Sequence, residues 1–176
     1  MQPLSLALAL LVSTVACAPS VRPPVAPQSV EGVEHRETRL RGHGGVDLYA
    51  QSWRPAEPAR GVVLIVHGLK DHSARYGDFA QHLATQGFAV HAFDLRGHGR
   101  SGGARAQVTA LGDYVADLEI FVAQVKAAEP GLPLIVMGHS MGGAIAMTYA
   151  LSTSPWSSPG REPFAGEDHP QARAQT

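Results

Sequence analysis

The sequence is poor in several features on which whole classes of protein depend. It contains one cysteine, Cys17, so no disulfide can form within the chain. Its 14 Lys and Arg residues nearly balance its 15 Asp and Glu residues, and no basic block is present. We therefore expect no nucleic-acid partner, because nucleic-acid binding depends on concentrated positive charge.

Metal-binding patterns are also lacking. Histidines stand near the ends of three apolar runs, but their spacing matches no zinc pattern such as H-E-x-x-H. These residues are His67, His72, His98 and His139. The sequence therefore predicts no metal site, and we expect no cofactor.

The first 17 residues differ from the rest of the chain. LSLALALLVSTVACA is almost wholly apolar and ends in small residues, which is typical of a secretory signal peptide, although MQPLSL carries no Lys or Arg. The run is shorter than the ~20 apolar residues that span a bilayer. Cys17 follows Val15 and Ala16, and this arrangement resembles the lipobox of bacterial lipoproteins, with Thr14 in place of the usual Leu.

Residues 18–32 support a lipid anchor at Cys17. They are rich in proline, and such a stretch favours an extended, semi-rigid spacer between an anchor and a folded domain. We therefore expect an exported lipoprotein on the periplasmic or extracellular face of a bacterial membrane. The alternative is a plain signal peptide that is cleaved beside Ala16 or Ala18.

The segment 33–151 has the pattern of a folded α/β domain. A hairpin is expected over 34–53, because two alternating segments flank a GHGG turn. Continuous apolar runs predict buried strands, and apolar residues three and four positions apart predict helices. The strands are 61–68, 88–95 and 132–137, and the helices are 76–87, 113–131 and 144–151. This alternation predicts a mainly parallel sheet with flanking helices.

Details of two helices are also predicted. In 76–87, Phe79 and Leu83 define an apolar face and Gly87 is the expected C-cap. In 113–131, an apolar stripe begins at Val115 and Asp113 is the expected N-cap.

The segment Gly138–Gly142 fits G-x-S-x-G, the nucleophile elbow, which requires a strand before it and a helix after it. LPLIVM and AIAMTYAL supply both. A strand that turns into a helix this sharply lifts the serine hydroxyl clear of the backbone, so we predict that Ser140 is a nucleophile. The alternative is a glycine-rich turn for tight packing or phosphate binding. No G-x-x-x-x-G-K-[ST] pattern is present, however, and the spacing at this turn does not fit G-x-G-x-x-G.

Acyl transfer at such a serine also needs donors for a developing oxyanion. One donor is expected from the backbone N–H of the residue after the nucleophile, here Met141. The other comes from the loop after an earlier strand. That loop begins HGLKDHS, which places Leu69 to offer its N–H.

Three segments, HGLKDHSARY, FDLRGHGRSGG and GHSMGGAIA, together resemble one branch of the α/β-hydrolases. This is the monoacylglycerol lipase and lysophospholipase-like branch, often labelled serine aminopeptidase S33-type. The resemblance covers residues 34–151 and implies Ser140 as nucleophile, with Leu69 and Met141 as oxyanion donors. It further implies hydrolysis of a small lipid-like carboxylic ester through an acyl-enzyme.

The resemblance also assigns structural roles. It implies that the four histidines shape loops, that Asp94 and Arg96 fix the loop after a strand, and that Arg75 and Tyr76 anchor the loop beside the oxyanion hole.

The chain changes character after Leu151. Residues 152–176 contain four prolines and no strand-length apolar run, so we predict a disordered tail. A serine nucleophile needs a histidine and a carboxylate, which in this fold follow it along the chain. The sole candidates in the tail are Asp168 and His169, whose adjacency places them poorly for a triad.

We therefore expect an incomplete α/β-hydrolase fold with an exposed apolar strand edge and helix face, and no activity from this chain alone. The alternative is a non-catalytic, membrane-tethered binding module on a degenerate hydrolase scaffold.

Overall fold

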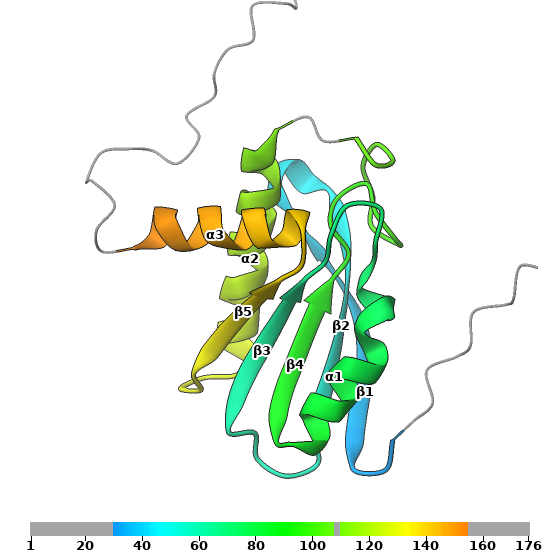
Figure 1. Cartoon of the computed structure of the whole chain (residues 1–176), viewed down its shortest axis with the longest axis vertical. Coiled ribbons are helices and arrows are strands. Elements are labelled where there is room, and N and C mark those ends of the chain that lie inside the picture. The colour runs from blue at the N-terminus through cyan, green and yellow to red at the C-terminus, as the bar shows by residue number, and fades with distance from the viewer. Residues whose placement is uncertain (1–29, 108–109, 155–176) are drawn as a thin grey trace, which may run out of the picture.

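The computed structural model describes residues 30–107 and 110–154 (Figure 1). The predicted segment 1–17, with Cys17, and most of the predicted linker 18–32 lie outside these residues. The described part contains the strands β1 (Val33–Arg41), β2 (Asp47–Pro55), β3 (Gly61–Val66), β4 (Phe88–Phe93) and β5 (Leu134–Gly138), the helices α1 (Gly77–Thr85), α2 (Leu111–Ala128) and α3 (Met141–Thr153), and the 3₁₀ turns η1 (His43–Gly45) and η2 (Ser73–Tyr76).

The strands form one sheet in the order β1-β2-β4-β3-β5. β1 pairs antiparallel with β2, and β2 pairs antiparallel with β4, whereas β3 is parallel to both β4 and β5. The predicted α/β architecture, with its hairpin followed by parallel strands, is therefore confirmed.

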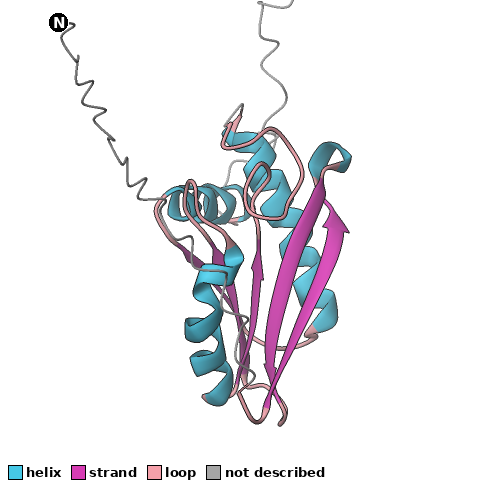
Figure 2. Ribbon diagram, turned by 90° about the vertical axis from the view of Figure 1, so that its right-hand side faces the viewer, coloured by secondary structure: helices cyan, strands magenta, loops and turns pink. Residues whose placement is uncertain are grey.

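Helices cover both faces of the sheet, as Figures 1 and 2 show. The burial of β3 reflects this layering, because all six of its residues are buried and they alternate between the two faces of the sheet. Val62, Leu64 and Val66 point into the cluster formed with α2 and α3, whereas Val63 and Ile65 point into the cluster formed with α1. A strand in the middle of two layers has no polar face, which is why its sequence is a continuous apolar run.

Two predictions about helix details are wrong. α2 begins at Leu111 and its N-cap is Ala110, so Asp113 is a first-turn residue and not the cap. The Asp113 carboxylate instead lies 3.2 Å from the Arg96 guanidinium. In α1 the buried face is formed by small residues such as Ala80 and Ala84, whereas Phe79 is 43% exposed. Gly87 lies just after the helix with φ of 84°, the conformation that terminates helices and that glycine adopts without strain.

α3 is longer than predicted. It runs through Ser152 and Thr153, which the sequence had assigned to the tail, and the tail from residue 155 onward lies outside the described residues.

The expected exposed apolar edge is present. In the described part of the chain β5 has a neighbour on one side only, and Ile135, Met147 and Leu151 are 57%, 67% and 66% exposed. None of the helices in residues 30–107 and 110–154 combines the length and apolar character that a membrane span requires.

A buried polar cluster lies where the end of α2 meets the sheet. The Glu129 carboxylate accepts a hydrogen bond of 3.0 Å from Arg54 and lies 3.2 Å from His91 Nε2. Burial lowers the pKa of His91 from its usual 6.5, although Glu129 opposes this effect. The folded protein therefore keeps His91 neutral at a pH where the unfolded chain binds a proton.

This cluster predicts a loss of stability in acid. The contribution of neutral His91 is present above the unfolded pKa and is lost as the pH falls below it. His91→Gln removes the titrating ring and retains a side-chain donor. We expect this variant to lose less free energy of unfolding than wild type between about pH 8 and about pH 5, as measured by urea denaturation.

The matched control is His82→Gln, at an exposed position on α1, which should show the wild-type pH dependence. Equal losses in the two variants would contradict the assignment to His91.

Candidate functional site

The turn between β5 and α3 holds Ser140 in an unusual backbone conformation. Its φ and ψ are 53° and −119°, and it is one of three non-glycine residues with positive φ in the described part of the chain. Such a conformation costs on the order of 1–3 kcal/mol and persists only where the surroundings enforce it. Ser140 is exposed and lies at the N-cap of α3, so its side chain stands at the positive end of a helix.

Two glycines enforce this turn. A Cβ atom at Gly138 would overlap the backbone of Gly142, and a Cβ atom at Gly142 would overlap the carbonyl oxygens of Val66 and His67. The sequence therefore needs glycine at both positions, because the first turn of α3 is packed directly on the backbone at the end of β3. This geometry is the predicted elbow.

Two backbone N–H groups in the segments next to Ser140 have no hydrogen-bond acceptor in the described part of the chain. In residues 30–107 and 110–154, neither the Leu69 N–H nor the Met141 N–H has a hydrogen-bond acceptor. A Cβ atom at Gly68 would lie 3.2 Å from the Ser140 Cβ, so the loop that carries Leu69 lies against the elbow. The segments that carry these two unbonded N–H groups therefore both lie next to Ser140, and the oxyanion hole stays a prediction.

Buried side chains fix the loop after β3. His67 Nδ1 lies 2.7 Å from the Gly68 oxygen, and its Nε2 accepts a bond of 2.9 Å from the Leu95 N–H. Burial lowers the pKa of His67, which keeps the ring neutral and able to accept.

Asp94 fixes the same loop from the end of β4. Its Oδ1 accepts bonds of 2.6 Å from both the N–H and the hydroxyl of Ser73, and its Oδ2 accepts a bond from the Arg100 N–H. Gln51 donates a further bond of 2.7 Å to the Ser73 hydroxyl. Asp94 therefore ties the loops after β3 and β4 together, as the sequence predicted.

A further carboxylate near these loops belongs to Asp117, which is fully buried on α2. Arg96 donates bonds of 2.7 and 2.9 Å to its two oxygens, in a bidentate pair. Asp117 also accepts the His43 N–H, so it connects α2, η1 and the loop after β4.

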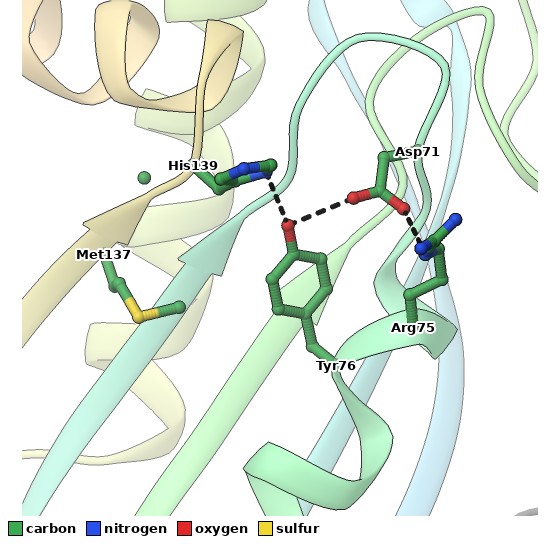
Figure 3. Close-up of a pocket in the computed structure, with 6 residues that line it drawn as sticks. Asp71, Arg75, Tyr76, Met137 and His139 are labelled. Carbon is green, nitrogen blue, oxygen red and sulfur yellow. Dashed lines mark hydrogen bonds and ion pairs between the residues drawn. The ribbon is translucent and has the colours of Figure 1, made fainter.

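Tyr76 links the loop after β3 to the elbow. Its hydroxyl donates a bond of 3.1 Å to Asp71 Oδ2 and lies 3.2 Å from His139 Nδ1 (Figure 3). Arg75 pairs with the other oxygen of Asp71 at 3.2 Å. These residues, together with Met137 and Gly138, line a hollow of about 480 Å³.

A proton acceptor for Ser140 is not visible in the described residues, because no side chain in 30–107 or 110–154 makes a hydrogen bond to its hydroxyl. His139 is adjacent in sequence, but its ring contacts Tyr76. Asp168 and His169 lie outside the described residues. Within the described part no cluster of three or more His, Cys, Asp or Glu residues could hold a metal ion.

Three polar residues that shape the site were not predicted from the sequence: Gln51, Asp71 and Asp117. Asp117 had a visible signal, because it stands on the apolar side of α2, three residues after Tyr114 and one before Leu118, and a buried carboxylate requires a partner. Gln51 had a weaker signal, as a polar residue that shares one face of β2 with Tyr49 and Trp53. Nothing in the sequence marked Asp71 as a partner of Tyr76.

The packing of α3 on β3 predicts opposite effects for two neighbouring glycines. Gly142→Ala places a methyl group on two carbonyl oxygens, so we expect a loss of about 3 kcal/mol in the free energy of unfolding. Gly143→Ala meets the Gly138 oxygen at an ordinary 3.5 Å in a helix, so its stability should be unchanged or raised by up to about 1 kcal/mol. Urea denaturation of both variants tests this, and similar losses would contradict the packing described above.

This chain is similar in sequence to known proteins, but it matches only part of their length. A monoacylglycerol lipase from Mycolicibacterium smegmatis is 42% identical over 113 residues, which are 64% of this chain and 40% of that protein. Human monoglyceride lipase is 37% identical over 106 residues, which are 60% of this chain and 35% of that protein. The chain thus spans well under half the length of these relatives.

Solved structures give the same result. A soluble variant of monoglyceride lipase from Saccharomyces cerevisiae, in complex with a substrate analogue, matches with a TM-score of 0.60 and 28% identity over 73% of this chain and 42% of that chain. The sequence profile of the family described as serine aminopeptidase, S33, matches residues 57–158, which are more than half of this chain. The elbow, the loop after β3 and the parallel strands β3 and β5 that bring them together all lie within that match, and the chain belongs to the serine aminopeptidase S33 family of α/β-hydrolases.

Proposed function

We propose that this protein is a serine hydrolase that cleaves carboxylic esters through an acyl-enzyme at Ser140. The observation that carries the proposal is the position of Ser140 on a strained turn, between the loop after β3 and α3, whose Leu69 and Met141 N–H groups have no acceptor in the described residues. The proposal concerns the activity of the whole protein, because the chain spans only part of its relatives.

In the proposed mechanism each group has one role. The Ser140 oxygen attacks the carbonyl carbon of the ester while a base takes its proton, and the carbonyl oxygen becomes an oxyanion. The Leu69 and Met141 N–H groups donate hydrogen bonds to that oxyanion, and the positive end of α3 stabilises its charge. The tetrahedral adduct then expels the alcohol and leaves an acyl group on Ser140. Water releases the acid in a second addition and elimination.

The substrate class proposed is a small lipid ester such as a monoacylglycerol or a lysophospholipid. The relatives named above as monoacylglycerol and monoglyceride lipases support this class, as does a Bacillus subtilis protein that is 26% identical over 98 residues and is named a phospholipase. Leu69, 48% exposed beside the elbow, offers an apolar contact for an acyl chain.

Replacement of the nucleophile tests the proposal. In the intact gene product we expect Ser140→Ala to lower kcat for a short acyl ester by about 10⁴-fold or more, because the reaction loses its covalent intermediate. The control Thr148→Ala removes a hydroxyl from the exposed face of the same helix and should leave kcat unchanged. Hydrolysis at the wild-type rate in Ser140→Ala would show that Ser140 is not the nucleophile.

A fluorophosphonate probe separates this proposal from the alternative of a non-catalytic binding module, because labelling requires an activated hydroxyl. Since no side chain in the described residues accepts a proton from Ser140, we expect weak labelling of the 176-residue chain itself. Rapid labelling at Ser140 would mean that a base reaches it from elsewhere in the chain.

We propose further that the protein is exported and anchored to a bacterial membrane through Cys17. The apolar run before Cys17 and the proline-rich segment after it support this location.

Metabolic labelling with a fatty-acid analogue in a bacterial host tests the anchor. We expect labelled protein in the membrane fraction for wild type, and an unlabelled protein released from that fraction for Cys17→Ser, because the acyl chains supply ~0.8 kcal/mol per buried methylene. Membrane association that persists without label in both proteins would refute lipidation at Cys17.

A further inference from the structure

We propose that Tyr76 is a positioning residue for the ester hydrolysis proposed above, whose hydroxyl ties the loop of Leu69 to the turn of Ser140 by holding His139 as its Nδ1–H tautomer. The proposal rests on that function for its kinetic part only. Its structural part rests on the contacts among Asp71, Tyr76 and His139.

The geometry places one hydroxyl between two segments far apart in sequence. Tyr76 ends η2, and its ring packs against the α1 side of the sheet. Its hydroxyl reaches Asp71 in the loop after β3 and His139 in the turn after β5, at 3.1 and 3.2 Å (Figure 3).

The count of protons fixes the direction of both hydrogen bonds. An ionised carboxylate only accepts, so the single phenol proton of Tyr76 goes to Asp71 Oδ2. The phenol oxygen can then only accept from His139, which requires a proton on Nδ1. A neutral His139 therefore leaves Nε2 as a free acceptor.

The surroundings of Tyr76 keep this arrangement in place. Burial, followed by the charge of Asp71, raises the pKa of Tyr76 to about 12, so its hydroxyl stays protonated at neutral pH. Asp71 itself is oriented by Arg75 and by the His72 N–H, which donates a bond of 2.9 Å to Oδ1.

The consequence concerns the two free N–H groups. Leu69 stands two residues before Asp71, and Met141 stands two residues after His139, so the link through Tyr76 joins the two segments that would hold the oxyanion between them. Without the hydroxyl, one side of that gap loses its restraint. Donors placed for a transition state matter more to kcat than to substrate affinity, so the loss should fall on kcat.

Tyr76→Phe keeps the ring and removes the hydroxyl, and Tyr149→Phe on α3 is the matched control. In protein with ¹⁵N-labelled histidine, at about pH 8, we expect His139 to show a protonated Nδ1 in wild type and in Tyr149→Phe. In Tyr76→Phe the signals should move toward the Nε2–H tautomer. A His139→Gln variant identifies the signals. An Nε2–H tautomer in wild type, or an unchanged tautomer in Tyr76→Phe, overturns the proposal.

The kinetic part is measured in the intact gene product with a short acyl ester. We expect Tyr76→Phe to lower kcat about tenfold and to change KM less than about twofold, with Tyr149→Phe unchanged. An unchanged kcat in Tyr76→Phe overturns the positioning role.

The structural part fails separately from the proposed function. If Ser140→Ala retains hydrolysis, the proposed nucleophile is wrong, while the tautomer measurement still decides whether Tyr76 holds His139.

Discussion

The site depends on one contact between backbones, where the first turn of α3 rests on the carbonyl groups at the end of β3. Gly142 makes this possible, because a single Cβ atom there would strike the oxygens of Val66 and His67. The same contact brings the loop after β3 against the elbow, at a distance set by the space that Gly68 leaves open. Since α3 cannot move away from β3 without breaking the turn, Ser140 is held at positive φ, and the strain of about 1–3 kcal/mol is offset by packing over the rest of the sheet.

Carboxylates near the site act as ties between loops. Asp94 joins the loops after β3 and β4, Asp117 joins α2 to the loop after β4, and Asp71 joins the loop after β3 to the elbow through Tyr76. Each accepts more than one hydrogen bond, and charge-assisted bonds of this kind hold irregular backbone in a single conformation. The loop that carries Leu69 is therefore held by a buried acid, Asp94, and by a half-buried acid, Asp71.

Local patterns predicted much of this structure. The strand at 61–66 was recognisable because a strand buried on both faces has no polar alternation, and the elbow because its glycines are a steric requirement. The N-cap of α2 was not recognisable, because an acid in the first turn and an acid at the cap look alike in the sequence. The ion pair between Asp113 and Arg96, which places Asp113 in the first turn, is visible only in the structure. Phe79 was assigned to the wrong face because α1 packs closely through alanines, a choice that depends on the size of Trp53 and its neighbours on the sheet. The link from Asp71 to His139 was equally invisible, because it depends on the register of two strands.

That register is also the reason why the loop of Leu69 and the start of α3 lie close together. β3 and β5 are parallel, and Val66 lies opposite Gly138, so both strands end at the same level of the sheet. The His139 N–H continues the hydrogen-bond ladder by donating a bond of 2.9 Å to the Val66 oxygen. Beyond this bond the two segments separate, one into the loop of Leu69 and the other into the helix that begins at Met141. A shift of the pairing by one residue would turn Gly138 and Ser140 to the other face of the sheet and remove the space that Gly142 needs. The closeness of the two segments is thus a product of backbone register, whereas the base that the proposed mechanism needs is a matter of side chains brought to Ser140 from a distance.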